Sequence, residues 1–174
     1  AAYGIEAGSS SIYAETGEVF TVEQALMALM LESANEMALA LAEKTSGSVK
    51  KFVELMNQRA AQLGCKNTHF NNPNGLPDEN HYTTCYDMAL ITKACLKHDE
   101  FRKITGTRNH VIGPTNICEE ERQLWQHCKM TNPDSKYYYE YCEGGKTGYT
   151  NDALNTLVTW SKKGDTELIC VLMN

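Results

Sequence analysis

Two short motifs carry side chains whose chemistry is complementary. The first, Ser33-Ala34-Asn35, places a hydroxyl and an amide, which both donate and accept hydrogen bonds, in a polar break of an apolar helical run. The second, Lys146-Thr147-Gly148, follows two glycines and offers a positive charge and a hydroxyl at the start of an expected strand. Taken singly, each has a plain structural explanation, because Ser33 or Asn35 can cap a helix and a glycine-rich stretch can be an ordinary turn.

The elements around the first motif are expected to be helical. Thr21 and Gln24 form a capping-box pattern, which is followed by apolar residues at helical spacing. These apolar residues are Val22, Ala25, Leu26, Leu29 and Met30. The pattern breaks at residues 32–35, and a helix is expected to resume over residues 37–42 and to end near Ser46-Gly47.

Two further helices are expected in the first half of the chain. One begins at Ser48 and stops at Gly64, a residue type that commonly ends helices. Its buried residues are expected to be Phe52, Leu55, Met56 and Leu63. Turn-forming residues over 71–78 predict a loop, and Thr84 with Asp87 then caps the next helix. The inner face of that helix is expected to contain Met88, Ile91, Cys95 and Leu96.

The elements around the second motif are expected to be strands. Short strands are predicted at 111–114 and from residue 123, and the aromatic run 137–142 has residue types that favour extended structure. Two more strands are predicted at 154–160 and 167–173, joined by a turn at 163–165. Helices in about residues 1–105 and antiparallel strands in about 106–174 indicate a single α+β domain.

Composition excludes some classes of function. The 174 residues suffice for one domain that buries roughly two-thirds of its unfolded surface. The net charge of −6 and the lack of a basic cluster argue against a nucleic-acid partner. No run of about 18 apolar residues predicts a membrane span, and no signal peptide is visible. The abrupt start and the apolar strand at the last residues suggest boundaries that are not natural termini.

The seven cysteines are numerous for this length and odd in number. No Cys-x-x-Cys occurs, and no ligand spacing fits a standard zinc site, so we expect no metal and no cofactor. Cys95 and Cys170 lie on apolar faces and are expected to be buried thiols. We expect the cysteines to be mainly unbridged, with Cys118 and Cys128, on either side of a predicted turn, as the one pair that could approach across strands.

The two motifs together, about 110 residues apart and in this order, resemble the second and third active-site motifs of serine penicillin-binding proteins and β-lactamases. The sequence between them is similar to the low-molecular-mass D-alanyl-D-alanine carboxypeptidases. The similar stretches are 63–70 with 72–76, 82–91, and 137–141 leading into 145–150. The resemblance extends from about Gly8 onward and implies a β-lactamase/transpeptidase-like domain, with a helical cluster packed against an antiparallel sheet.

The resemblance also implies roles for the motif residues. Ser33 would pass a proton to the leaving D-alanine, and Asn35 would hold the family's catalytic lysine and the substrate peptide group. Lys146 would set a positive potential, and Thr147 would bind the substrate carboxylate. Gly148 would let the substrate lie against the strand, and Tyr149 would supply an oxyanion-hole N–H. These six are the candidate site residues; Ala34 stands where the family usually has glycine.

The family's first motif, Ser-x-x-Lys, supplies the nucleophile and its base and precedes Ser-x-Asn. No Ser-x-x-Lys lies in the residues before Ser33. A formal match at Ser48-Val49-Lys50-Lys51 follows the Ser-x-Asn motif and opens a helix, so we interpret Ser48 as its N-cap. The sequence therefore predicts a truncated domain that lacks the nucleophile segment and is inactive by itself.

Two functions remain open at this level. The parent protein is expected to be a serine-type D-Ala-D-Ala carboxypeptidase of the cell envelope, which acts on peptidoglycan stem peptides and binds β-lactams. The alternative is a non-catalytic peptidoglycan-binding or scaffold domain; a β-lactamase is disfavoured by the sequence between the motifs. We further expect the Lys146 strand to be accessible at a sheet edge facing Ser33 and Asn35.

A last expectation concerns the surface. We expect the helices present to be too few to cover the apolar residues of the first two helical segments. The residues expected to be exposed are Leu26, Leu29, Met30, Met37 and Leu41. An exposed apolar patch of this kind favours self-association.

Overall fold

The computed structural model describes residues 8–174 and has helices in its first part and strands in its second. The helices are α1 (Val22–Glu32), α2 (Asn35–Ser46), α3 (Val49–Gln62), α4 (Cys85–Cys95) and α5 (Asp99–Gly106), with a 3₁₀ turn η1 (Lys129–Thr131). The strands are β1 (Asn109–Ile112), β2 (Arg122–Trp125), β3 (Cys142–Thr150), β4 (Leu154–Lys163) and β5 (Thr166–Leu172). The expected α+β class is confirmed, although α5 was not foreseen as a separate helix.

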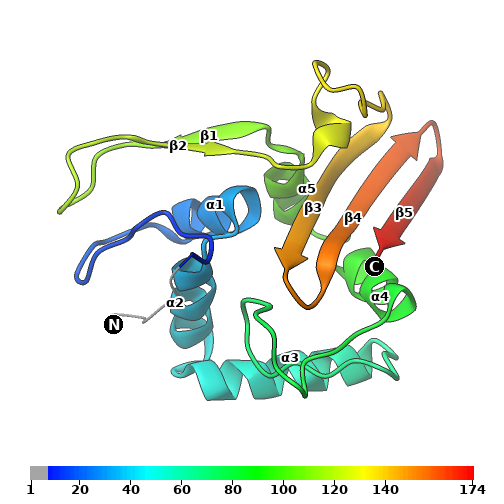
Figure 1. The fold of residues 1–174 in the computed structure, drawn as a ribbon, viewed down its shortest axis with the longest axis horizontal. Helices are drawn as coiled ribbons and strands as arrows, with labels where there is room; N and C mark the ends of the chain where they lie inside the picture. The colour runs from blue at the N-terminus through cyan, green and yellow to red at the C-terminus, as the bar shows by residue number, and fades with distance from the viewer. Residues whose placement is uncertain (1–7) are drawn as a thin grey trace.

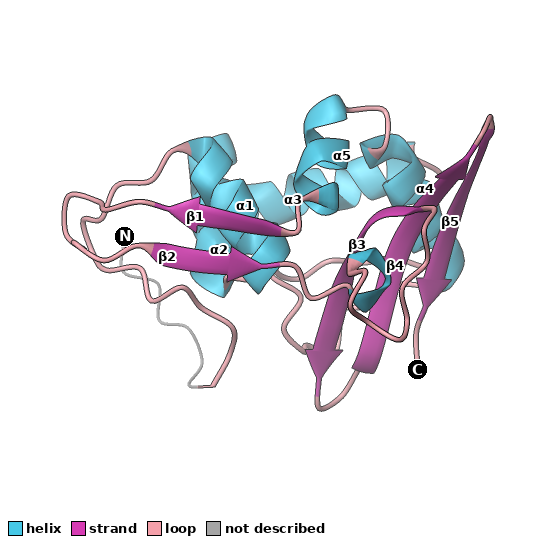
Figure 2. Ribbon diagram, turned by 90° about the horizontal axis from the view of Figure 1, so that it is seen from above, coloured by secondary structure: helices cyan, strands magenta, loops and turns pink. Residues whose placement is uncertain are grey.

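The strands form two antiparallel sheets. The hairpin β1–β2 packs beside α1, and the larger sheet has the order β3-β4-β5. Helix α5 packs against β3, and α4 packs against β5 (Figure 1). Figure 2 shows the hairpin extending past α1 on one side of the molecule and the larger sheet on the other. In this arrangement β3 is the strand of its sheet that lies nearest to α1.

Helix α1 begins with the expected capping box and is the centre of the core. The Thr21 hydroxyl accepts a hydrogen bond from the Gln24 backbone, and the Gln24 side chain accepts one from the Thr21 backbone. The buried face of α1 is rotated about the helix axis from the expected one, because Val22, expected to be buried, is 53% exposed. The most buried residues of the helix are Ala25, Met27, Ala28 and Leu31. Since α2, α5 and the hairpin all contact α1, the small alanines lie where these neighbours approach most closely.

The expected exposed patch on the first two helices is also wrong. Met37 is 3% exposed, and its four companions are half-buried against the core. Those companions are Leu26, Leu29, Met30 and Leu41. The expected segment from Val49 onward does form α3, capped by the Ser48 hydroxyl, but Leu55 is 46% exposed. Helix α3 packs mainly on α2, so one face of it is covered and Leu55 lies off that face.

The aromatic run before β3 is not extended, contrary to expectation. Successive turns are closed by hydrogen bonds from Tyr138 N to Ser135 O at 3.0 Å and from Cys142 N to Tyr139 O at 2.9 Å. Strand propensity depends on finding a partner strand, and here the strand begins only at Cys142. From there β3 pairs with β4, with Lys146 opposite Val158. The expected strands β4 and β5 and their connecting turn are confirmed.

Candidate active site

Ser33 lies at the sharp junction between α1 and α2. It is the C-cap of α1 and has left-handed backbone angles, φ 58° and ψ 34°, which are uncommon for a residue other than glycine. The next residue, Ala34, is fully buried, and its N–H donates to Ala28 O at 3.3 Å. The core on both sides therefore holds Ser33 in this conformation and leaves its side chain half-buried at the surface of the junction.

Lys146 reaches this junction from the edge strand β3. Its Nζ donates hydrogen bonds to Ser33 Oγ and, at 2.6 Å, to Thr147 O. Burial lowers the pKa of the Lys146 amine, because the charged form loses hydration. Among residues 8–174 no carboxylate forms an ion pair with it. The structure thus brings the first residues of the two motifs into contact across 113 positions of the chain.

Two consecutive glycines determine how closely β3 approaches its neighbours before Lys146. A Cβ added to Gly144 would lie 2.6 Å from Trp160 Nε1 and 2.9 Å from the backbone carbonyl of Thr105 on α5. A Cβ added to Gly145 would lie 2.8 Å from Val158 O. Only glycine permits this approach, so the pair helps to set where Lys146 enters the junction.

Asn35 begins α2, and its side chain already has partners within the chain. Its backbone N–H and its Nδ2 both donate to Ser10 O, at 3.0 and 2.9 Å. Its Oδ1 accepts a hydrogen bond from Asn74 Nδ2 at 2.9 Å. Asn35 Nδ2 keeps one further N–H to donate, and Asn35 Oδ1 keeps one further position to accept a hydrogen bond. The structure therefore links the Asn35 amide to residue 10 and to the 71–78 loop.

Two residues of this neighbourhood were missed by sequence reasoning. Glu36 is buried, and its Oε1 accepts hydrogen bonds from Ser11 Oγ and Ile12 N, both at 2.8 Å. It thereby fastens the segment whose Ser10 carbonyl holds Asn35. Asn74 lies in the 71–78 loop, whose sequence predicted a turn and nothing about its contacts. The sequence contained one signal for Glu36. It is a carboxylate that directly follows the Ser-x-Asn motif within an apolar run.

The remaining candidate residues continue along β3. Thr147, Gly148 and Tyr149 pair with Leu157, Thr156 and Asn155 of β4. Because β3 is an edge strand, one side of it keeps backbone groups that can pair with an extended peptide. The Thr147 hydroxyl has no hydrogen-bond partner among the described residues, and Tyr149 is 64% exposed.

Gly148 has a structural requirement inside the sheet. A Cβ at this position would lie 2.5 Å from Thr156 Oγ1 on the neighbouring strand. The expected reason for a glycine here was room for a bound substrate. The cross-strand contact with Thr156 is a reason that needs no substrate.

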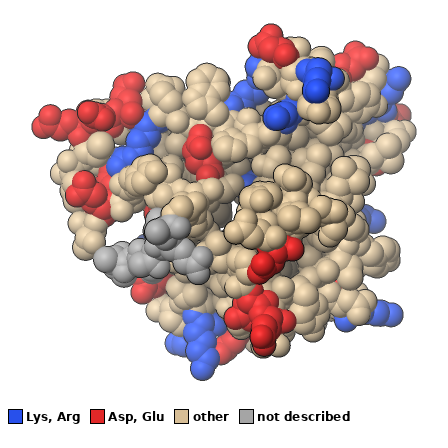
Figure 3. Space-filling model, viewed as in Figure 1, with Lys and Arg blue, Asp and Glu red and all other residues tan. Residues whose placement is uncertain are grey.

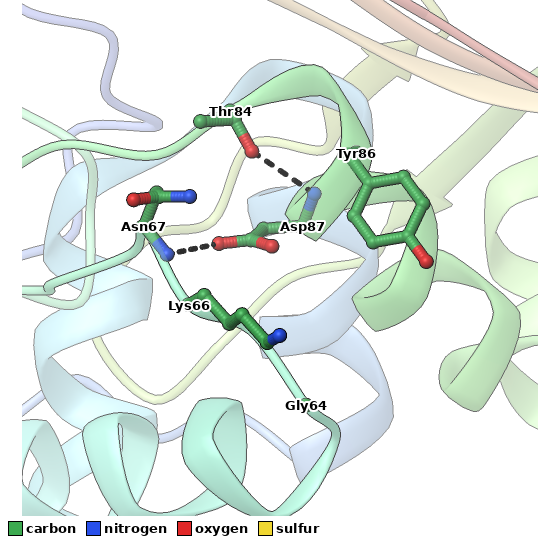
Figure 4. Close-up of a pocket in the computed structure, with 6 residues that line it drawn as sticks. All are labelled: Gly64, Lys66, Asn67, Thr84, Tyr86 and Asp87. Carbon is green, nitrogen blue, oxygen red and sulfur yellow. Dashed lines mark hydrogen bonds between the residues drawn. The ribbon is translucent and has the colours of Figure 1, made fainter.

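One pocket lies away from this junction. It measures about 470 Å³ and is found between the end of α3 and the start of α4. Its lining residues are Gly64, Lys66, Asn67, Thr84, Tyr86 and Asp87 (Figure 4). Burial raises the pKa of Asp87, but hydrogen bonds from Thr68 and from the Asn67 backbone outweigh it, so the pKa lies below its usual range. The Asp87 carboxylate thus ties the loop after α3 to α4, which is a structural role.

Charge and potential metal ligands complete the description of the surface. On the face shown in Figure 3 the Lys and Arg side chains lie in small separate groups. Within residues 8–174 no group of three or more His, Cys, Asp or Glu side chains is placed to hold a metal ion. No helix in that part of the chain is long and apolar enough to cross a membrane.

Comparisons with known proteins identify the family of this chain. The sequence model of the D-alanyl-D-alanine carboxypeptidase family, peptidase S11, matches residues 1–174. The D-alanyl-D-alanine carboxypeptidase DacF of Bacillus subtilis is 39% identical over 165 residues, which are 95% of this chain and 41% of that protein. DacB2 of Mycobacterium tuberculosis is 31% identical over 171 residues, 97% of this chain and 55% of the relative. The chain thus spans about half or less of the length of these relatives.

Solved structures show the same fold. The Streptomyces K15 DD-transpeptidase superposes with a TM-score of 0.85 at 27% identity, covering 95% of this chain and 64% of that one. A putative penicillin-binding protein homologue, Rv2911 of Mycobacterium tuberculosis, gives a TM-score of 0.86 at 28% identity, covering 97% and 62%. The match over the full sequence and the contact between Ser33 and Lys146 lead to one assignment. The chain belongs to the D-alanyl-D-alanine carboxypeptidase family.

Proposed function

We propose that the junction of Ser33 with Lys146 is one side of the active site of a serine-type D-Ala-D-Ala carboxypeptidase. The observation that carries the proposal is the hydrogen bond from Lys146 Nζ to Ser33 Oγ. A hydroxyl that contacts a desolvated amine is suited to relay a proton, because the amine pKa is shifted toward neutrality by burial. The substrate would be a peptidoglycan stem peptide that ends in D-Ala-D-Ala, and β-lactams would compete for the same site.

The edge of β3 would hold the substrate. An extended peptide can add to an edge strand through its backbone, which would align the scissile bond beside Ser33. Thr147, whose hydroxyl has no partner within residues 8–174, would bind the terminal carboxylate, near the positive charge of Lys146. Tyr149 would supply one N–H to the oxyanion, and Gly148 lets β3 pack closely against Thr156.

The acylation step needs a serine nucleophile with a base, and no Ser-x-x-Lys precedes Ser33 in this sequence. The formal match at Ser48 does not substitute for it, because the Ser48 hydroxyl accepts a hydrogen bond from Lys51 N as the cap of α3. We therefore expect this chain, tested by itself, to form no acyl-enzyme. Loss of a nucleophile lowers turnover by on the order of 10⁶-fold in a protease where it was measured.

The test uses a labelled penicillin and intact-protein mass. This chain should show no adduct, whereas the product of the complete gene should gain one penicillin and should lose it in the Lys146→Ala variant. If a Ser-x-x-Lys motif is encoded upstream, its serine and lysine are the next residues to substitute. A stoichiometric adduct on this chain alone would contradict the assignment of roles and would make Ser33 or Ser48 the nucleophile.

A non-catalytic peptidoglycan-binding or scaffold domain is the second candidate. It is favoured by one observation, the engagement of the Asn35 amide by Ser10 and Asn74 within the chain. For this candidate the complete gene product would bind a D-Ala-D-Ala peptide without releasing D-alanine. In either case the ligand would be a cell-wall component, so we propose an extracytoplasmic location at the cell envelope.

A further inference from the structure

We propose that Cys128 and Cys142 are a thiol pair that forms a disulfide by exchange with a small-molecule or protein disulfide. This bond would close the 13-residue segment 129–141 and fasten it to the start of β3. The inference does not depend on the proposed function.

The fold brings the two cysteines to the same place, at the start of β3. Cys128 immediately precedes η1, Cys142 is the first residue of β3, and η1 packs on β3. Between them, Tyr139 N donates to Met130 O at 3.1 Å, which draws the two ends of the segment together. The Cys128 sulfur lies 3.0 Å from the site of a Cβ on Gly145, and the Cys142 sulfur lies 3.7 Å from the carbonyl oxygen of Gly144, so both sulfur atoms lie beside the same pair of glycines at the start of β3.

The pairing differs from the one expected from the sequence. Cys118 was the expected neighbour of Cys128, but its sulfur contacts Glu120 O at 3.6 Å in the turn between β1 and β2. Cys65 likewise contacts a backbone carbonyl, that of Asp87. All seven cysteines are free thiols in this structure, which therefore represents the reduced form.

The two thiols are chemically unequal, and this defines the order of the exchange. The neighbouring Cys142 thiol, together with backbone N–H groups of Met130 and Thr131, lowers the pKa of Cys128. The neighbouring Cys128 sulfur, together with burial, raises the pKa of Cys142. Cys128 is therefore the attacking thiolate and Cys142 the resolving thiol.

The reaction proceeds in two exchanges. The Cys128 thiolate attacks one sulfur of the external disulfide, the S–S bond of that disulfide breaks, and one thiolate leaves. Cys142 then loses its proton and attacks the Cys128 sulfur of the mixed disulfide, which expels the second thiolate. The two protein thiols are oxidised, the external disulfide is reduced to two thiols, and the two protons end on those thiols.

Burial restricts when the exchange can occur. Cys128 is 1% and Cys142 9% exposed, so the segment must open, or must not yet have closed during folding, for the external disulfide to enter. Once formed, the bond would restrain the strand that presents Lys146. The site for a Cβ on Gly145, the residue before Lys146, is 3.0 Å from Cys128 Sγ.

The test is oxidation of the purified chain with oxidised glutathione, followed by alkylation and peptide mapping under non-reducing conditions. The expected product has lost two hydrogens, contains a Cys128–Cys142 cross-linked peptide and has a higher melting temperature than the reduced chain. Cys142→Ser should abolish both the cross-link and the temperature shift. The matched control Cys118→Ser should retain both.

Two results would overturn the proposal. One is a chain that still has seven alkylated thiols after oxidation; the other is a cross-link from Cys128 to any cysteine but Cys142. The mapping is done on the unsubstituted chain, so the result does not depend on whether Cys142→Ser folds. Oxidation in denaturant should give mixed pairings, which shows that the fold selects this pair.

Discussion

The junction of α1 with α2 and the sheet β3–β5 carry the two halves of the site, and they are held in different ways. Around the junction Ala28 and Ala34 are fully buried, and Leu31 is 1% exposed. On β5, by contrast, Leu168 is 66% exposed. The junction is positioned by a core that surrounds it, whereas β3 is positioned by pairing with β4 and by the close approach of Gly144 and Gly145 to their neighbours.

This difference predicts how substitutions in each half should affect the stability and position of its elements. Substitutions under the junction should lower the stability of the whole chain, because they remove buried contacts shared by α1, α2 and the hairpin. Substitutions in β3 should act by displacing β3 itself, which among the described strands pairs only with β4. The same free edge is what the proposed substrate would need.

The largest effect is expected at Leu31. Leu31→Ala should lower the free energy of unfolding by about 2–5 kcal/mol, because it leaves a cavity in the core beneath the junction. Urea unfolding measures it. Leu168→Ala removes the same atoms from an exposed position and should change stability by no more than about 0.5 kcal/mol. Equal losses in the two variants would refute the contrast between junction and sheet.

A smaller loss is expected at Gly144. Gly144→Ala should cost about 1–3 kcal/mol, since its Cβ would overlap the Thr105 backbone and Trp160. Gly113→Ala is the matched control, because a Cβ there meets nothing within 4 Å. Amide hydrogen exchange should show faster exchange in β3 than in α1 for the Gly144 variant. Uniform acceleration in both elements would mean that β3 is not the separately held half.

The features that sequence reasoning predicted are those with local causes. The caps at Thr21, Ser48 and Thr84 each depend on residues three positions away, and all three form. The β4–β5 hairpin depends on two apolar runs around Gly164. The positions of Ser33 and Lys146 in the two motifs could be read in the same way, because both motifs are contiguous.

The features that sequence reasoning missed depend on distant neighbours. Asn74 contacts Asn35 across 39 positions, and nothing in the loop sequence indicates which side chain it meets. Cys142, not Cys118, lies beside Cys128 because Tyr139 pairs with Met130 and the aromatic run forms turns. Leu55 is exposed because α3 has one main partner helix. Local propensity contains none of this information.

Lys146 permits a test of the site by pH. Its pKa in the folded chain lies below the ordinary value of 10.5, so between the two pKa values the unfolded chain binds more protons. The free energy of unfolding should therefore rise as pH increases from the folded pKa toward 10.5. Below the folded pKa, the cost of burying the charged amine should lower stability by its full amount. Lys146→Met should remove this rise, measured as the difference in urea midpoint between pH 7 and pH 10. Lys163→Met, at an exposed position, should leave it intact.

The smallest effect is expected at Asn74, and it tests whether this residue belongs to the proposed site. Asn74→Ala removes the hydrogen bond to Asn35 Oδ1, a partly buried neutral interaction, and should cost about 0.5–1.5 kcal/mol. Asn151→Ala, in an exposed turn, should change stability by no more than about 0.5 kcal/mol. The decisive measurement is made in the complete gene product.

If Asn35 works in catalysis, loss of Asn74 should lower the rate of penicillin acylation more than it lowers peptide affinity, because a less restrained amide spends less time in the reactive orientation. If the Asn35 amide serves only to tie the 71–78 loop to residue 10, the thermal stability should fall while the acylation rate per folded molecule stays the same. An unchanged Asn35 amide resonance by NMR would instead contradict the hydrogen bond itself. The outcome decides whether Asn74 belongs to the site or only to the fold that surrounds it.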